Sequence, residues 1–520
     1  MNKLWAKVWV LFFLIPLVTA EERKAVRLNV LLISVDDLKP LTRAYGDPHA
    51  VTPNLDRLAR RGRLFQNAQC QQAICTASRA SLLTGLYPDV TGVVDLHTNI
   101  RDVNPDVVTL PQYFREQGYI TAGVGKTFDS RNVDEGMDAV SWSLPYGERY
   151  MPPVFEPAAP YPQGYYQEPE TQERYREVER MMEDRKEKGL EPIRRPFGES
   201  PGSRPPTESL DVSDQAYVDG ANTVIALKLL EELATKEKPF FLSVGYYKPH
   251  LPFVAPEKYW ELYDREAFSL AEVRELPATA PDLAFQNSWE LRTYSDIPDG
   301  PLPEDLQREL IHGYYACVSY IDTQVGRLLD QLDELDLTEK TIIVLFGDHG
   351  FHLGDHGMWC KHSNYEQAVR SPLIIAVPEM AGQGESSDAV TGFIDLFPTL
   401  SDLAGLPIPD ALQGVSLRPI LDNPAAEVKK VELSQFPRNW EGQYYMGYSL
   451  RDRRYRYTAW LKSDRPTGTP LADAVWEELY DYETDPEETV NLASHPDHQT
   501  RVSGFARILK QKLSDIQPNR

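Results

Sequence analysis

A cysteine and an arginine in the first fifth of the chain have the spacing of neighbours on a helix. Cys75 is followed by Arg79 four residues later, and the segment continues into Leu83-Thr84-Gly85. Residues four apart lie on the same face of a helix. The residues after Cys75 suit a helix, so Cys75 should stand at its N-terminus, where unpaired backbone N–H groups favour an anion. The pattern predicts an anion site at Cys75, although a lone cysteine is usually a buried structural residue.

Polar residues also follow four apolar segments that have the composition of strands. Open α/β sheets bind ligands at the carboxyl ends of their strands. We therefore expect these polar groups to meet on one rim of a sheet. The pairs of segment and polar group are 29–35 with Asp36-Asp37, 119–125 with Lys126, 240–244 with Lys248-Pro249-His250, and 341–346 with Asp348-His349.

The acidic residues of this set suit a hard divalent cation. Asp36, Asp37 and Asp348 offer carboxylate oxygens, and His349 adds a nitrogen. Calcium is the cation that such oxygen ligands favour. An isolated Asp-Asp pair is usually a turn or a solvated helix cap, so the indication comes from its combination with Asp348, His349 and Cys75. The sequence predicts one Ca²⁺ beside Cys75.

The order of strand-like and helical segments predicts an α/β fold. We expect a large mixed, mainly parallel sheet flanked by helices, in a main catalytic domain over residues 25–425. From about residue 431 the pattern changes to alternating strands and a closing helix, which predicts a smaller C-terminal antiparallel α+β subdomain over 430–520. The clearest helical segments are 54–62, 214–233 and 306–335.

Two segments have the composition of insertions in the main domain. Residues 145–210 are rich in Pro, Tyr, Glu and Arg with little apolar periodicity, and residues 265–305 are similar. Surface loops are the simplest interpretation. Long ordered loops in a compact domain often shape a binding site, so substrate selection is the alternative.

Residues 1–20 have the pattern of a secretory signal peptide. A positively charged start precedes an apolar run from Val8 to Val18, and small residues lead to Ala20. The run is shorter than the roughly 20 apolar residues that span a bilayer. We expect cleavage before Glu21, no stable membrane anchor, and a secreted or periplasmic protein.

Charge and cysteine content narrow the classes of function. The chain has 520 residues and a formal net charge of −24, which argues against nucleic acid as a partner. Four cysteines in an exported chain of this length do not build a disulfide-based fold. If Cys75 belongs to a functional motif, three cysteines remain: Cys70, Cys317 and Cys360. Because cysteines pair two by two, at least one of these three must be a free thiol.

Taken together, these motifs resemble those of type I (formylglycine-dependent) sulfatases of the alkaline phosphatase superfamily, and within them the iduronate-2-sulfatase subgroup and its bacterial relatives. The resemblance covers nearly the whole mature chain. It implies an alkaline phosphatase/sulfatase-like fold. The segments that carry it include Cys75–Gly85, Val124-Gly125-Lys126, Val244–Phe253, Ser319–Leu328, Asp348-His349-Gly350 and Leu353–Gly357.

The resemblance also implies a role for each motif residue. Cys75 would be oxidised to formylglycine by a formylglycine-generating maturation enzyme, and one hydroxyl of the hydrate would attack sulfur while the other later expels sulfate. The remaining roles would be Ca²⁺ ligation by Asp36, Asp37, Asp348 and His349 with the formylglycine, orientation of the hydrate by Arg79, binding of sulfate oxygens by Lys126 and Lys361, and protonation of the leaving sugar oxygen by His250.

The implied activity is hydrolysis of O-sulfate esters of carbohydrates, with 2-O-sulfated uronic acid of a glycosaminoglycan or algal polysaccharide as the expected substrate. One position departs from the pattern, which has a histidine three residues after Lys126; here that residue is Asp129, which cannot be a cationic donor. Two alternatives stay open. One is a phosphate or phosphonate ester hydrolase of the same superfamily, and the other is an inactive binder of sulfated polysaccharide, which Asp129 permits.

Overall fold

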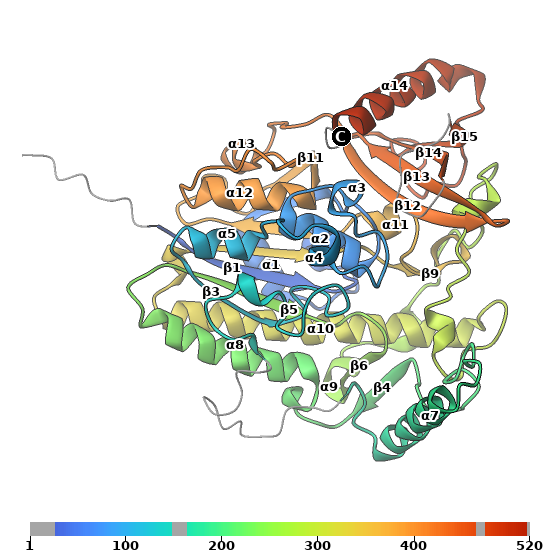
Figure 1. Ribbon diagram of the computed structural model, residues 1–520, viewed down its shortest axis with the longest axis horizontal. Helices are drawn as coiled ribbons and strands as arrows, with labels where there is room; N and C mark the ends of the chain where they lie inside the picture. Colours follow the sequence, from blue (N-terminus) through green and yellow to red (C-terminus); the bar gives the residue numbers. More distant parts are fainter. Residues whose placement is uncertain (1–26, 148–163, 464–473, 517–520) are drawn as a thin grey trace, which may run out of the picture.

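A seven-stranded mixed sheet lies at the centre of the molecule (Figure 1). The computed structural model describes residues 27–147, 164–463 and 474–516. The strand order is β11-β2-β10-β7-β1-β5-β3, and β10 alone runs against its neighbours, which confirms the predicted mainly parallel sheet. The strands are β1 (Asn29–Val35), β2 (Arg63–Gln69), β3 (Ile120–Gly125), β5 (Phe240–Tyr246), β7 (Thr341–Gly347), β10 (Leu373–Ala376) and β11 (Ser386–Gly392).

The four strands that the sequence predicts to carry polar groups are direct neighbours, in the order β3-β5-β1-β7. They are nearly continuous apolar runs because both faces of the sheet are covered. Val35 pairs with Tyr246 on one side and with Gly347 on the other, and Gly125 pairs with Gly245. The four strands therefore end almost level, and the residues after them share one edge of the sheet.

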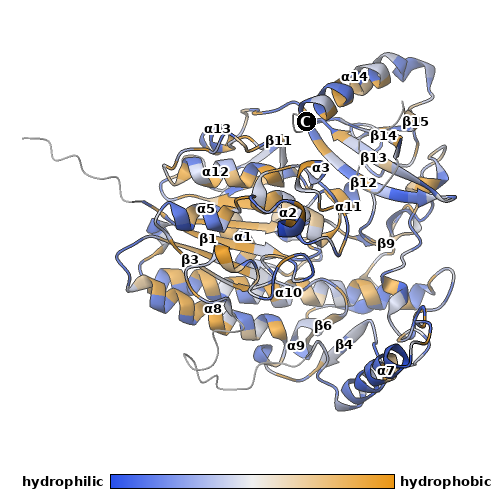
Figure 2. Cartoon of the chain, viewed as in Figure 1, coloured by the Kyte–Doolittle hydropathy of each residue, from blue (hydrophilic) through white to orange (hydrophobic). Residues whose placement is uncertain are grey.

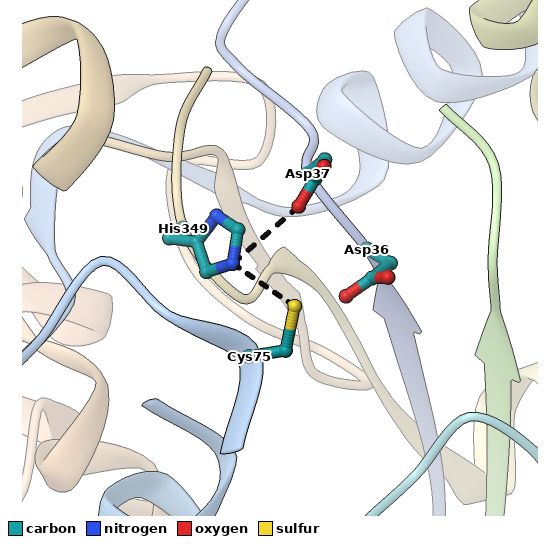
Figure 3. Close-up of side chains that lie close together, drawn as sticks. All are labelled: Asp36, Asp37, Cys75 and His349. Carbon is teal, nitrogen blue, oxygen red and sulfur yellow. Dashed lines mark hydrogen bonds and ion pairs between the residues drawn. The ribbon is translucent and has the colours of Figure 1, made fainter. Parts of the chain in front are cut away.

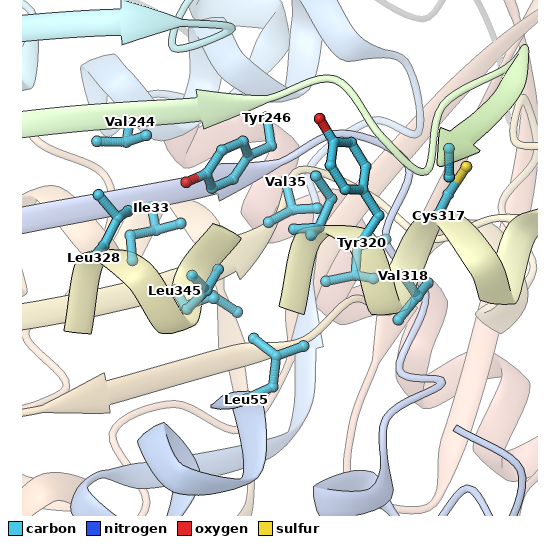
Figure 4. Packing of buried hydrophobic residues seen from close by; sticks show 14 of the residues in the cluster. Ile33, Val35, Leu55, Val244, Tyr246, Cys317, Val318, Tyr320, Leu328 and Leu345 are labelled. Carbon is cyan, nitrogen blue, oxygen red and sulfur yellow. The ribbon is translucent and has the colours of Figure 1, made fainter. Parts of the chain in front are cut away.

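Helices cover both faces of the sheet (Figure 1). Figure 4 shows the packing on one face, where Leu328 of the long helix α10 lies beside Ile33 of β1. Both side chains are fully buried, and replacing such a leucine by alanine costs about 2–5 kcal/mol of stability. One face is covered by α1 (Pro53–Arg61), α8 (Val218–Ala234) and α10 (Glu304–Glu334), the other by α2 (Cys75–Thr84), α5 (Leu110–Glu116), α12 (Leu396–Leu403) and α13 (Arg418–Asp422).

The C-terminal part forms the predicted antiparallel α+β unit. Its four-stranded sheet has the order β12-β13-β14-β15, and α14 (Gln499–Ile516) packs on it through Val502, Phe505 and Leu509. A buried ionic cluster joins this unit to the 3₁₀ turn after β11, since Lys429 pairs with Asp395 and Glu432. The strands are β12 (Glu432–Trp440), β13 (Gln443–Arg451), β14 (Tyr455–Ser463) and β15 (Ala474–Asp481).

The insertion 145–210 contains a helix that its composition did not indicate. Helix α7 (Pro169–Glu187) is hydrophilic along its length (Figure 2), and Val178 is its one buried residue. Such a helix has no apolar periodicity to read. Charged side chains one turn apart support it, for example Arg174 with Glu170. The surface-loop interpretation of this segment was therefore incomplete, whereas within 265–305 the structure has only short 3₁₀ turns ahead of α10.

No helix in the three described stretches is long and apolar enough to cross a membrane, and the predicted signal peptide over 1–20 lies outside those stretches. All four cysteines are free and buried, in keeping with a fold that is not disulfide-based.

The remaining helices and strands are short. They are α3 (Pro88–Thr91), α4 (Ile100–Val103), α9 (Glu257–Trp260), α11 (Glu366–Val369), β4 (Thr207–Leu210), β6 (Phe253–Pro256), β8 (His352–Leu353) and β9 (Trp359–Cys360).

Candidate active site

Four of the predicted site residues converge where the strands end. Asp36, Asp37, Cys75 and His349 point toward one another (Figure 3), and their ligand atoms all lie within 4.8 Å of one another. The Sγ atom of Cys75 lies 3.4 Å from Nε2 of His349. The two aspartates follow β1, the histidine follows β7, and Cys75 opens α2. The predicted helix N-terminus and the predicted rim thus coincide.

The tautomer of His349 makes this cluster a fitting cation site. Nδ1 of His349 lies 3.0 Å from the carbonyl oxygen of Gly350, which can only accept, so Nδ1 carries the proton. Nε2 then faces Oδ1 of Asp37 at 3.4 Å, and this buried oxygen has no hydrogen-bond partner. Two electron-rich atoms face each other there, an arrangement that a second ring proton or a bound cation would stabilise.

The donor set matches calcium at its two carboxylates, whereas the imidazole of His349 and the thiol of Cys75 offer nitrogen and sulfur. Carboxylate oxygens are the ligands that Ca²⁺ prefers, and Asp36 and Asp37 supply them. The thiol of Cys75 is a soft ligand that suits other metals. Conversion of Cys75 to an oxygen-bearing side chain would remove this mismatch.

Asp348 lies beside the cluster with its oxygens already engaged. Oδ1 accepts hydrogen bonds from the backbone N–H groups of Asp37 and His349, at 3.1 and 3.0 Å, and Oδ2 accepts from Nε of Arg79 at 2.9 Å. It is also 3.8 Å from Nε2 of His349. In this geometry Asp348 orients the neighbouring groups, and its predicted role as a cation ligand stays a prediction.

Arg79 pairs with two of the aspartates that lie near Cys75. It is fully buried, and its guanidinium bridges Asp36 at 3.2 Å and Asp348 at 2.9 Å. It also donates to the carbonyl oxygens of Lys126 and Thr127. The predicted orientation of a hydrate on Cys75 would therefore be indirect, because the groups that Arg79 holds are the ends of β1, β3 and β7.

The environment of Cys75 keeps its sulfur protonated. The residue is 1% exposed, and burial, together with the negative charge of Asp36, raises its pKa well above the ordinary value of a thiol. A thiol is a weak nucleophile compared with a thiolate. The site therefore does not activate an unmodified cysteine.

Two lysines supply the positive charge of the site. Nζ of Lys126 lies 2.5 Å from Asp36, and Nζ of Lys361 lies 3.1 Å from Asp37 and 2.8 Å from Glu290. Burial lowers the pKa of both ammonium groups, but the carboxylates that face them raise it well above the usual value. Both side chains line a cavity of about 410 Å³ that also reaches Cys75 and His250. The predicted sulfate-binding lysines thus meet in one cavity.

Glu290 is a site residue that sequence reasoning missed. Its Oε1 lies 3.0 Å from Nε2 of His250, and the carboxylate also pairs with Lys361 and, at 3.7 Å, with Nε2 of His362. Burial raises the pKa of Glu290, but Lys361 and His250 hold it well below the usual value, so it is a carboxylate. Glu290 lies in the insertion 265–305, where no motif marked it.

Asp129, at the position that departs from the family pattern, is part of an ion-pair network. It accepts from Nε and Nη2 of Arg131, each at 2.7 Å, and lies 3.4 Å from Nζ of Lys126. Burial raises the pKa of Asp129, but Lys126 and Arg131 bring it well below the usual range. Asp129 therefore brings the guanidinium of Arg131 to the cavity.

Comparison with known proteins identifies the class to which this fold and site belong. The sulfatase family matches residues 28–406, and the C-terminal domain described as that of N-sulphoglucosamine sulphohydrolase matches residues 354–518. The chain belongs to the sulfatase family. It is similar to iduronate 2-sulfatase of Homo sapiens, with 34% identity over 534 residues that cover 89% of this chain and 91% of the relative.

Solved structures show the same fold. A protein described as a 2-O GAG sulfatase superposes with a TM-score of 0.63 at 23% identity, covering 94% of this chain and 92% of the other. The phosphonate monoester hydrolase from Silicibacter pomeroyi superposes with a TM-score of 0.68, also at 23% identity, covering 95% and 96%. The predicted membership in the sulfatase family and the predicted fold are both confirmed.

Proposed function

We propose that this protein hydrolyses O-sulfate esters of carbohydrates, with a 2-O-sulfated uronic acid residue of a glycosaminoglycan or algal polysaccharide as its substrate. One observation carries the proposal: Cys75 opens onto a cavity whose charged residues could neutralise a sulfate ester and protonate its leaving group. The similarity to iduronate 2-sulfatase over about nine tenths of both chains supports the choice of sugar.

The cation and the modified residue would complete the site. Asp36, Asp37 and His349 would hold Ca²⁺, which supplies positive charge to the sulfate oxygens. Formylglycine at position 75, made by a maturation enzyme, would supply a hydroxyl nucleophile in its hydrated form. This accounts for a cysteine whose thiol the protein keeps protonated.

The chain's own residues would perform the other tasks. Lys126 and Lys361 remain charged and reach the cavity, so they can bind the remaining sulfate oxygens where negative charge is concentrated. His250 lines the same cavity, and a proton on Nε2, the atom now paired with Glu290, can pass to the departing sugar oxygen. Arg79 would keep the ends of three strands in register around the cation.

Export is the second part of the proposal. The signal pattern over residues 1–20 and the small number of cysteines, all free, are compatible with a secreted or periplasmic enzyme. Expression in the native host, followed by fractionation and N-terminal sequencing of the mature chain, tests this. A chain that keeps residues 1–20 and stays in the cytosol would exclude it.

The decisive experiment measures the inorganic sulfate released from a 2-O-sulfated uronide. The wild-type protein should release sulfate, and the Cys75→Ala variant should not. The corresponding phosphate and phosphonate esters form the comparison arm, and preferred turnover of either would favour the alternative hydrolase. Mass analysis of the peptide containing Cys75, from protein made in its native host, should find an aldehyde; an unmodified thiol with no turnover would favour the inactive binder.

A further inference from the structure

One arginine on the wall of the cavity has no carboxylate partner among the residues that the structure describes. Lys126, Lys361 and Arg131 each pair with a carboxylate. Lys248 gives its ammonium group to backbone carbonyls. The guanidinium of Arg204 instead meets hydroxyl groups, those of Thr293 at 3.3 Å and of Tyr294. A partly buried guanidinium without a counter-charge is costly to desolvate, so its place in the wall calls for a ligand.

Arg204 is held firmly in its position. Its guanidinium carbon lies 4.2 Å from the ring centre of Tyr294 and 5.4 Å from that of Phe197. Its backbone N–H donates to Oγ of Ser295, and its carbonyl oxygen accepts from the N–H of Ser295. Stacking on an aromatic face leaves the edge of the guanidinium free to donate hydrogen bonds. The group is therefore preorganised to bind a ligand.

The two insertions build this wall together. Tyr165 and Arg204 come from the first, and Trp289, Thr293 and Tyr294 from the second, and all five line the cavity that contains Cys75. Trp289 is 44% exposed and offers an aromatic face of the kind on which a sugar ring packs. The cavity thus has a floor at Cys75, where the sulfate ester would react, and a wall that carries the guanidinium of Arg204.

We propose that Arg204 binds a second anionic group of the substrate, distinct from the sulfate ester that is cleaved. This inference rests on the proposed function. The ligand chemistry is an oxyanion that can take two parallel N–H donors from a guanidinium, with Thr293 as a neighbouring hydroxyl. Such an oxyanion has two sources in a sulfated polysaccharide: the carboxylate of the same uronic acid, or a sulfate on the adjoining sugar.

Three substrates separate these sources: a 2-O-sulfated uronide, its carboxyl-reduced counterpart, and the reduced counterpart with a sulfate on the adjoining sugar. If the carboxylate is the ligand, Arg204→Gln should lower kcat/KM on the first substrate by about 10- to 100-fold, mostly through KM, and on the other two by at most about 3-fold. If the adjoining sulfate is the ligand, the third substrate should show the loss. Arg204→Lys should be intermediate, because it keeps the charge and loses the two-point contact. Arg180→Gln, on the exposed face of α7, is the matched control and should match wild type throughout.

Binding measurements keep this test independent of turnover. In a Cys75→Ala background, isothermal titration calorimetry with the same three substrates should show the same selective loss of affinity for Arg204→Gln. Equal losses on all three, or none, would overturn the role of Arg204 even if sulfate release establishes the sulfatase. Selective binding with no sulfate release by the unmutated enzyme would instead refute the proposed function and leave the anion site in place. Thermal unfolding of each variant checks that the fold is retained.

Discussion

Oε1 of Glu290 lies 3.0 Å from Nε2 of His250, although the two residues belong to different loops. Nδ1 of the same ring lies 2.6 Å from the carbonyl oxygen of Leu251. Both partners of the ring accept hydrogen bonds, so each ring nitrogen faces an acceptor. In the proposed reaction Glu290 would therefore orient His250 as the proton donor, and it would do so from an insertion without a recognisable motif.

Replacing Glu290 by glutamine should slow sulfate release from a sugar. The neutral amide no longer holds His250 as a donor, so kcat should fall by about 10- to 100-fold, within the range of general acid catalysis. Turnover of 4-nitrophenyl sulfate should fall much less, because nitrophenolate leaves without a proton. His250→Gln should show the same contrast, and the double variant should be no worse than either single one. Equal losses on both substrates would contradict this role.

Replacing Arg79 by lysine should damage both stability and activity. Lysine keeps the charge but cannot bridge Asp36 and Asp348 as the planar guanidinium does. We expect a loss of about 2–5 kcal/mol, the range for breaking a buried ion pair, measured by thermal unfolding, and at least about 100-fold lower kcat/KM. The matched control is Arg63→Lys, a buried arginine that pairs with Glu385 away from the site. It should lower stability and leave kcat near wild type; equal effects on kcat would show that Arg79 is merely structural.

Calcium should stabilise the protein through Asp37. Oδ1 of Asp37 faces Nε2 of His349 with no hydrogen-bond donor between them, so a chelated protein should unfold at a lower temperature and lose activity. Ca²⁺ at 100 times its Kd should restore about 2.7 kcal/mol. Differential scanning fluorimetry with Ca²⁺, Mg²⁺ and Zn²⁺ measures this. The Asp37→Asn variant should respond weakly to Ca²⁺, and a response of the wild type to Zn²⁺ alone would argue for a different metal.

Mild acid should weaken the fold through His352. This buried ring has its Nε2 2.9 Å from Oγ of Ser363, and burial lowers its pKa from 6.5 to about 3. Between pH 3 and pH 6.5 the unfolded chain therefore binds more protons at His352 than the folded chain does. Above pH 6.5 this difference costs no stability, and below pH 6.5 the free energy of unfolding decreases as the pH falls. At pH 5 the loss is about 2 kcal/mol.

His352→Gln provides the control for this pH effect, because glutamine does not titrate and can still meet Ser363. The difference between the melting temperatures at pH 7.5 and pH 5 should be smaller for the variant than for wild type. Carboxylates titrate in both proteins and cancel in the comparison. The same pH difference in both would mean that His352 is not the group responsible.

Sequence reasoning succeeded where local pattern and sheet geometry decide the outcome. Parallel strands end on one edge, so the sequence alone predicts that the groups after β1, β3, β5 and β7 lie together. Helix spacing likewise placed Arg79 on the same side as Cys75. Both predictions depend only on the geometry of a single sheet or a single helix, and the structure agrees with them.

Sequence reasoning failed where distant segments meet through tertiary packing. Glu290 and Arg204 lie in insertions whose course depends on contacts such as the paired backbone of Arg204 and Ser295. Helix α7 has no buried stripe, so periodicity could not detect it. The engagement of Asp348 by Arg79 depends on the angles at which α2 and β7 approach, which residue types alone do not specify.

The burial of Cys75 sets an order of events in biosynthesis. Its sulfur lies in the first turn of α2, and the residue is 1% exposed once that helix has docked on the sheet. An enzyme that modifies Cys75 must bind several residues on either side of it. In the folded chain every residue of α2 is buried. Any maturation of this thiol by another enzyme must therefore come before folding is finished. A molecule that folds first would stay in the thiol form until it unfolds again.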